Sequence, residues 1–180
     1  MSSAYKILPH YTYDDRLPWE DRWELIDGIP YAMSPSPAPR HQRVAAELRY
    51  AFMLALKSSD CIACSAYDPI DYKISDDTVL IPDILIVCGD IKKQYLDFPP
   101  VLVVEILSPS TALKDRNTKM QLYAREKVSY YLIIDPDAEV TEIYQLTGDQ
   151  YRLQDFSDDF TFELQEGCRI NVKLNGIFNI

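Results

Sequence analysis

Two nearly continuous apolar runs, at residues 84–88 (ILIVC) and 101–107 (VLVVEIL), constrain the fold more than any other feature of this sequence. Neither run alternates apolar with polar residues, as a strand with one solvated face does. Runs of this kind are typical of strands that are buried on both faces of a sheet. The chain must therefore cover a sheet from two sides. Its 180 residues, 47% of them hydrophobic, suffice to do so as a single domain over residues 1–180.

The rest of the sequence predicts the elements that surround these strands. Asp27-Gly28, within residues 23–33, predicts a β-hairpin. Helical spacing of apolar residues predicts a helix over 40–57, behind a rigid Pro-rich connector at 34–39. Capping residues at 108–111 favour a second helix over 112–126. Further strands are expected at residues 61–66, 69–74, 130–134, 139–146, 150–154, 160–164 and 170–172, the last two as edge strands. This order predicts a mixed α/β sheet flanked by two main helices, with an N-terminal hairpin.

Glu105 is the only charged residue in its apolar run. A buried carboxylate without a partner costs several kcal/mol or becomes protonated. We therefore expect Glu105 to face a metal ion, a Lys or Arg side chain, or backbone N–H groups. Asp83 is placed similarly, at the start of the other run. Two carboxylates on neighbouring strands can bind Mg²⁺, and a nearby lysine can assist hydrolysis. Pairing of both carboxylates with core arginines is the simpler alternative.

The net charge of −10 argues against a broad nucleic-acid-binding surface. A basic patch must be local, and the same residues also fit ordinary solvated helix faces. The candidates are Lys114, Arg116, Lys119, Arg125 and Lys127, or Arg40, Arg43 and Arg49. We expect weak non-specific binding to DNA.

The cysteines and the N-terminal residues indicate the cellular compartment in which the protein is expected. Cys61 and Cys64 form a CxxC motif, but no second pair would complete a zinc site. Residues 1–9 contain one lysine and no apolar core of a secretory signal, and no run is long enough to cross a bilayer. We therefore expect a cytoplasmic protein with free thiols and no membrane association.

Residues 82–136 resemble the Uma2 family of restriction-endonuclease-like proteins. The similarity lies in a PD dipeptide before an apolar strand, then VVEILSPST, a charged helix containing LYAR, and YYLIIDPDAEVTEIYQL. The segment WELIDGIPYAMSPSPAPRHQRV also resembles the family's N-terminal signature, so the similarity covers about residues 19–146. It implies the PD-(D/E)xK nuclease fold, a mixed sheet between helices.

The resemblance also implies site residues. Asp83 matches the PD aspartate and Glu105 the second acidic residue. Position 107 is leucine, so Lys119, on the following helix, takes the place of the usual lysine. His41 and Glu24 match recurring accessory positions. We expect Mg²⁺ or Mn²⁺ at Asp83 and Glu105, with the carbonyl of Ile106 as third ligand.

The function that the resemblance implies is metal-dependent hydrolysis of phosphodiester bonds in DNA. The alternative is a non-catalytic interaction or regulatory protein that retains the nuclease fold. It is favoured by the acidic charge and by Tyr130, which stands where the family has a glutamate. A structural subunit that pairs through its edge strands, or a homodimer, is also compatible with the sequence.

Simpler roles exist for individual residues. Lys119 can pair with Asp115 one turn earlier on its helix, and His41 can serve only as a hydrogen-bond donor. Asp115 and Arg116 are expected at the surface. If Lys119 belongs to the site, its loss should abolish cleavage and leave folding nearly intact.

Overall fold

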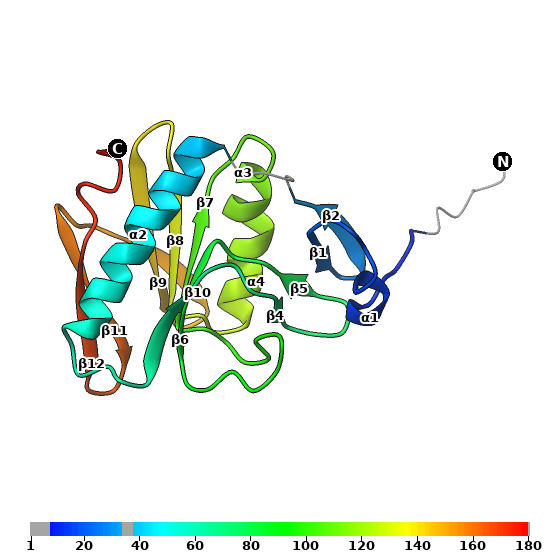
Figure 1. Cartoon of the computed structure of the whole chain (residues 1–180), viewed down its shortest axis with the longest axis horizontal. Helices are drawn as coiled ribbons and strands as arrows, with labels where there is room; N and C mark the ends of the chain where they lie inside the picture. The colour runs from blue at the N-terminus through cyan, green and yellow to red at the C-terminus, as the bar shows by residue number, and fades with distance from the viewer. Residues whose placement is uncertain (1–7, 34–37, 180) are drawn as a thin grey trace.

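A six-stranded mixed sheet forms the centre of the computed structural model, which describes residues 8–33 and 38–179 (Figure 1). The strand order is β10-β9-β8-β7-β6-β3, and β7 and β8 are the parallel pair. The strands are β3 (Cys64–Tyr67), β6 (Ile84–Cys88), β7 (Leu102–Ile106), β8 (Tyr130–Asp135), β9 (Val140–Thr147) and β10 (Gln150–Gln154). The two apolar runs are thus adjacent antiparallel strands, and every residue of β7 is buried, as predicted.

Different elements cover the two faces of this sheet. The helix α2 (Pro39–Lys57) packs on one face and buries Val44, Leu48, Phe52 and Leu56, which are spaced by four. On the same face lies a separate two-stranded sheet of β11 (Asp159–Gln165) and β12 (Cys168–Lys173). The expectation of edge strands in this C-terminal region was therefore wrong. Phe162 and Ile170 are buried because the hairpin lies against the core instead of extending the main sheet.

The second predicted helix covers the opposite face, where Leu122 and Tyr123 pack against β6, β7 and β8. It consists of α3 (Ala112–Lys114), a π-helical turn η1 (Asp115–Lys119) and α4 (Met120–Arg125). The sequence predicts the helix but not its π-helical turn. A π-helix usually occurs as a single turn within an α-helix, and it is often found at a functional site.

A four-stranded sheet of order β2-β1-β5-β4 lies beside the main sheet (Figure 1). Its elements are β1 (Trp23–Ile26), β2 (Ile29–Ala32), β4 (Tyr72–Lys73) and β5 (Val79–Leu80), preceded by α1 (Tyr13–Arg16). The strand expected at 69–74 is therefore reduced to β4. Residues 34–37 of the predicted Pro-rich connector lie outside the described residues, and Pro39 opens α2 as expected. None of the helices in the described ranges is long and apolar enough to cross a membrane.

The β1–β2 turn confirms the hairpin predicted from Asp27-Gly28, because both residues have positive φ, of 49° and 74°. A Cβ atom at Gly28 would lie 2.2 Å from Cδ2 of His10. We expect Gly28→Ala to lower the free energy of unfolding by about 1–3 kcal/mol in urea titration. Gly148→Ala is the matched control, since Gly148 also has positive φ but nothing lies within 4 Å of its Cβ position. Equal losses in both variants would show that the His10 contact adds nothing.

The cysteines contradict the expectation of free thiols. Cys61 is bonded to Cys168 and Cys64 to Cys88, so no cysteine of the chain is free. Spacing along the sequence could not reveal this, because the pairs are 107 and 24 residues apart. The antiparallel register of β3 with β6 places Cys64 directly opposite Cys88.

Candidate functional site

The paired ends of β6 and β7 bring Asp83 and Glu105 together. Asp83 immediately precedes β6, and Glu105 is the penultimate residue of β7. Because Ile84 lies opposite Val104, these two carboxylates meet at the same end of the strand pair. Oδ2 of Asp83 accepts a hydrogen bond of 2.8 Å from the backbone N–H of Ile106. The structure thus groups three residues that the sequence predicts as metal ligands.

The partner that the buried Glu105 requires is Lys119. Glu105 is 3% exposed, and its Oε1 accepts a hydrogen bond of 2.9 Å from Nζ of Lys119. The hydroxyl of Tyr123 donates to the same oxygen, at 2.8 Å. Lys119 itself is 2% exposed. It reaches Glu105 from the π-helical turn, and it is not a surface residue of its helix.

Two further carboxylates contact the same ammonium group. Nζ of Lys119 lies 2.7 Å from Oε1 of Glu24 and 3.4 Å from Oδ1 of Asp115. The simpler pairing with Asp115 is therefore present, but only as one arm of a larger network. Asp115 is 1% exposed, so its expected surface position was wrong. Arg116 does lie toward solvent, where it forms an ion pair with Glu142.

Glu24 connects the smaller sheet to this network. It lies on β1, is fully buried, and accepts a hydrogen bond of 3.0 Å from the backbone N–H of Ile81. Lys114 forms an ion pair with its second carboxylate oxygen. Glu24 was expected as an accessory residue and Asp115 as a pairing partner of Lys119, whereas the contacts of Lys114 and Tyr123 with the network were not predicted from the sequence. The available signal was the spacing of Asp115, Lys119 and Tyr123, which repeats every four residues on the helix after β7.

His41, near the start of α2, contacts the metal-ligand candidates from the other face of the sheet. Its Nε2 lies 3.0 Å from the carbonyl oxygen of Ile106 and 3.5 Å from Oδ2 of Asp83. Its Nδ1 is buried and has no hydrogen-bond partner among the described residues. Burial alone would lower the pKa of His41, but the hydrogen bond and the charge of Asp83 raise it. His41 therefore lies within the site, where it can hold Ile106 and Asp83 in place.

Burial shifts the pKa values of the ionisable groups in the network. Burial raises the pKa of Glu105 well above its ordinary value, and the attraction of Lys119 offsets this only in part. Burial also raises the pKa of Asp115. Lys119 stays charged, because the surrounding carboxylates outweigh its burial and raise its pKa. Three carboxylates, of Glu24, Glu105 and Asp115, contact the ammonium of Lys119, and Glu24 also pairs with Lys114. A divalent cation beside Glu105 would favour the charged form of its carboxylate.

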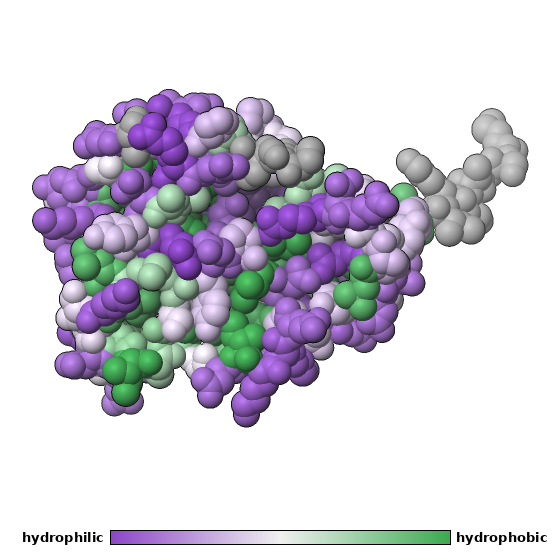
Figure 2. Space-filling view, viewed as in Figure 1, coloured by the Kyte–Doolittle hydropathy of each residue, from purple (hydrophilic) through white to green (hydrophobic). Residues whose placement is uncertain are grey.

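A cavity of about 810 Å³ opens onto these residues and is lined by Asp83, Glu105 and Ile106. Its volume is within the range typical of ligand-binding pockets. Arg22, Arg40 and Arg49 also line it. Hydrophilic residues prevail over the upper half of the face shown in Figure 2, the half in which the carboxyl end of β7 lies (Figure 1). An anionic, hydrophilic ligand in this cavity would lie near the three arginines and near the candidate metal ligands.

The donor atoms fit Mg²⁺ or Mn²⁺. Both ions prefer oxygen ligands, and Mg²⁺ commonly uses one or two carboxylates and several waters. The hydrogen bonds above use Oδ2 of Asp83 and Oε1 of Glu105, so each carboxylate has a second oxygen with which to bind a cation. With the cysteines in disulfides, no three His, Cys, Asp or Glu side chains group as a ready metal site among residues 8–33 and 38–179. The carbonyl of Ile106 and water would complete the coordination.

Tyr130, which departs from the family's pattern, lies away from this site. Its side chain packs on Phe160 and Phe162, on the face of the sheet opposite Glu105. Its hydroxyl accepts a hydrogen bond of 3.1 Å from the backbone N–H of Glu163. Tyr130 thus anchors the β11–β12 hairpin and makes no direct contact with the acidic network.

Comparisons with known proteins agree with the observed fold and with the resemblance of the sequence to the Uma2 family. The sequence pattern of the Uma2 family, described as "Putative restriction endonuclease", matches residues 11–175. An uncharacterized protein of Synechocystis sp. (strain ATCC 27184 / PCC 6803 / Kazusa), slr1290, is 28% identical over 178 residues, which span 94% of this chain and 88% of that protein. The crystal structure of a "putative nuclease belonging to DUF820" from Anabaena variabilis ATCC 29413 superposes with a TM-score of 0.72. It is 17% identical and covers 93% of this chain and 97% of its own, so it supports the restriction-endonuclease-like fold.

Proposed function

This chain belongs to the Uma2 family, and we propose that it is a cytoplasmic, single-domain endonuclease that hydrolyses phosphodiester bonds in DNA with Mg²⁺ or Mn²⁺. One observation carries the proposal. Asp83, Glu105 and Ile106 line the same cavity, Asp83 is hydrogen-bonded to the N–H of Ile106, and Lys119 contacts Glu105 at 2.9 Å. The residues that the family resemblance predicts for the site therefore lie together at the wall of one cavity.

Each residue has a role that follows from its contacts. Asp83, Glu105 and the Ile106 carbonyl would hold the ion, which supplies Lewis-acid activation of a phosphoryl oxygen and of a water molecule. Lys119 and Tyr123 donate to Glu105 and fix the orientation of its carboxylate. The positive charge of Lys119 also offsets negative charge that develops on the phosphoryl group.

A non-catalytic interaction protein with the same fold is the second candidate. The observation that favours it is the ion pairing of Lys119, whose ammonium is shared among three carboxylates of the protein itself. The net charge of −10 also favours it. Catalysis requires that Lys119 act on the site while it keeps these contacts, whereas a binding protein needs them only for stability.

Cleavage of supercoiled plasmid DNA separates the two candidates. We expect nicking with Mg²⁺ or Mn²⁺, and none after addition of EDTA. Replacement of the metal by Ca²⁺, which has a larger and more flexible coordination shell, should preserve DNA binding and suppress cleavage. A chain that binds DNA but cleaves it with none of these ions is an interaction protein.

The salt dependence of DNA binding provides a further prediction. Arg40 and Arg49, at the cavity, are already paired with Glu139 and Asp68, and Arg22 is exposed. Few positively charged side chains at the cavity are thus available to contact DNA phosphates. Fluorescence anisotropy in Ca²⁺ should give a slope of log K against log salt no steeper than about −3, since each phosphate contributes about −0.9. A slope near −7 would reveal an additional basic surface, such as one formed by a homodimer.

A further inference from the structure

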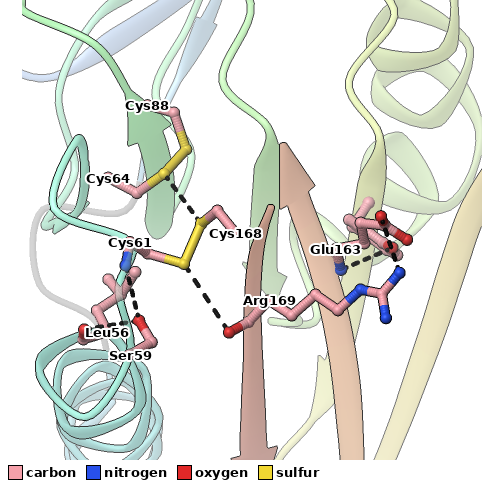
Figure 3. The surroundings of a disulfide bond; sticks show 9 residues. Leu56, Ser59, Cys61, Cys64, Cys88, Glu163, Cys168 and Arg169 are labelled. Atoms are coloured by element: carbon pink, nitrogen blue, oxygen red, sulfur yellow. Dashed lines mark hydrogen bonds and ion pairs between the residues drawn. A yellow bond between two sulfur atoms is a disulfide. The ribbon is translucent and has the colours of Figure 1, made fainter. Parts of the chain in front are cut away.

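All four cysteines of the chain meet at one place, although they come from distant parts of the sequence (Figure 3). Cys61 precedes β3, Cys64 begins it, Cys88 ends β6, and Cys168 begins β12. The two disulfides touch, because Sγ of Cys64 lies 3.7 Å from Sγ of Cys168. Cys88 is at the opposite end of β6 from Asp83, so the cluster is separate from the candidate functional site.

The backbone holds these sulfur atoms together independently of the S–S bonds. Cys64 and Cys88 are directly opposite each other in the β3–β6 register, with Cα atoms 3.9 Å apart. The adjacent hydrogen bond, from N–H of Gly89 to the carbonyl of Ala63, makes them a non-hydrogen-bonded pair, in which side chains lie close. The hydroxyl of Ser59 accepts a hydrogen bond from N–H of Cys61 and so fixes the start of the CxxC turn.

The second pair is held by the packing of the C-terminal hairpin. The Cα atoms of Cys61 and Cys168 are 5.1 Å apart, and β12 packs against α2, the helix that precedes Cys61 in the sequence. Cleavage of the two S–S bonds would therefore leave four thiols in one place.

Four convergent thiolates form one of the usual ligand sets of structural Zn²⁺, and CxxC is a common spacing for two of them. A tetrahedral Zn²⁺ with Zn–S bonds of about 2.3 Å has sulfur atoms about 3.8 Å apart. The observed separation of 3.7 Å between the two disulfides is close to this value. Cys61, Cys64 and Cys168 are buried within the hydrophobic cluster beneath α2, and Cys88 packs against it. The fold thus brings Cys88 and Cys168 to the CxxC motif as the second pair of ligands, which the spacing of cysteines in the sequence does not show.

We propose that the reduced chain binds one Zn²⁺ through the thiolates of Cys61, Cys64, Cys88 and Cys168. A dithiol reductant transfers two electrons and two protons to each disulfide, which gives two cysteine thiols and the oxidised dithiol. Zn²⁺ then displaces the four thiol protons into solvent. The turn after α2, the end of β6 and the start of β12 remain cross-linked in both states. Disulfides serve this purpose under oxidising conditions, and zinc serves it where thiols are kept reduced.

The test uses the full chain, reduced with dithiothreitol and freed of reductant without oxygen. Co²⁺ serves as a spectroscopic substitute for Zn²⁺. We expect one thiolate-bound Co²⁺ per reduced chain, counted from a thiolate-to-cobalt charge-transfer band that Zn²⁺ abolishes, and no such band in the oxidised chain. Asp83→Asn should leave the band unchanged, because only thiolates produce it. Cys88→Ser should weaken Zn²⁺ binding by at least about 100-fold, since loss of a direct ligand exceeds the loss of an outer partner.

Thiol alkylation of the wild-type chain makes the test independent of any variant that fails to fold. Zn²⁺ should protect all four thiols of the reduced chain from iodoacetamide, and EDTA should remove the protection. The proposal is overturned if dithiothreitol does not open the disulfides of the folded chain. Equally fast alkylation with and without Zn²⁺, or Co²⁺ uptake without a thiolate band, would also overturn it.

Discussion

Replacement of Lys119 by methionine is expected to lower the free energy of unfolding by about 3–5 kcal/mol, the range found when one partner of a buried ion pair is removed. Lys119 is 2% exposed and contacts the carboxylates of Glu24, Glu105 and Asp115. Methionine has a similar volume but no charge, so these carboxylates would remain buried without their shared cation. Urea titration of both proteins at pH 7 measures the difference. Because Lys119 is buried, its loss should destabilise the protein, in contrast to the expectation from the sequence that folding would stay nearly intact.

Lys127→Met is the matched control for Lys119→Met. Lys127 also pairs with a carboxylate, that of Asp149, but both side chains are exposed. Solvent screens such pairs, so the control should unfold almost as the wild type does. If Lys119→Met were as stable as Lys127→Met, the buried network would not be held together by its lysine.

The largest expected effect on activity comes from Asp83→Asn. Asparagine preserves the shape of the side chain and can still accept the hydrogen bond from N–H of Ile106, but it removes the negative charge that a cation requires. The proposed metal contributes several kcal/mol to the transition state, and each 1.36 kcal/mol is a factor of ten. We therefore expect metal-dependent DNA cleavage to fall by about 10²-fold or more. The rate of plasmid nicking in Mg²⁺ measures it.

Asp137→Asn provides the control for charge alone. Asp137 is exposed and lines the same cavity, at the turn after β8. Its replacement changes the net charge equally but leaves the candidate metal ligands in place, so nicking should continue at nearly the wild-type rate. Similar losses in both variants would mean that the overall charge of the cavity matters, and not the ligand role of Asp83.

The central strands and main helices could be predicted from the sequence because their patterns are local. The run VLVVEIL contains its own evidence of burial, and the spacing of Val44, Leu48, Phe52 and Leu56 defines a helix face without reference to any other segment. The placement of β11 and β12 could not be predicted in this way. Their alternating residues suit an edge strand and a packed hairpin equally, and only tertiary contacts decide between them.

The candidate site likewise combines residues that the sequence identifies with residues whose position depends on the fold. Glu105 could be recognised because a lone charge in an apolar strand requires a partner, and the family resemblance indicated Lys119 as that partner. The expected surface position of Asp115 was wrong, because the helix after β7 is not a regular α-helix at that residue. The π-helical turn at 115–119 widens the helix there, and both ends of the turn are buried. No local pattern in the sequence indicates that widening.

Calorimetric titration with Mn²⁺ tests the central claim, that Asp83 and Glu105 bind one divalent cation, most directly. The chain should be titrated with both disulfides intact, so that no thiolate competes for the metal. We predict that the wild type binds one Mn²⁺, and that Asp83→Asn and Glu105→Gln each weaken this binding by at least about tenfold, or about 1.4 kcal/mol. Asp137→Asn should bind Mn²⁺ as the wild type does. Equal Mn²⁺ affinity in the wild type and Asp83→Asn, or no binding by either, would contradict the assignment of this site.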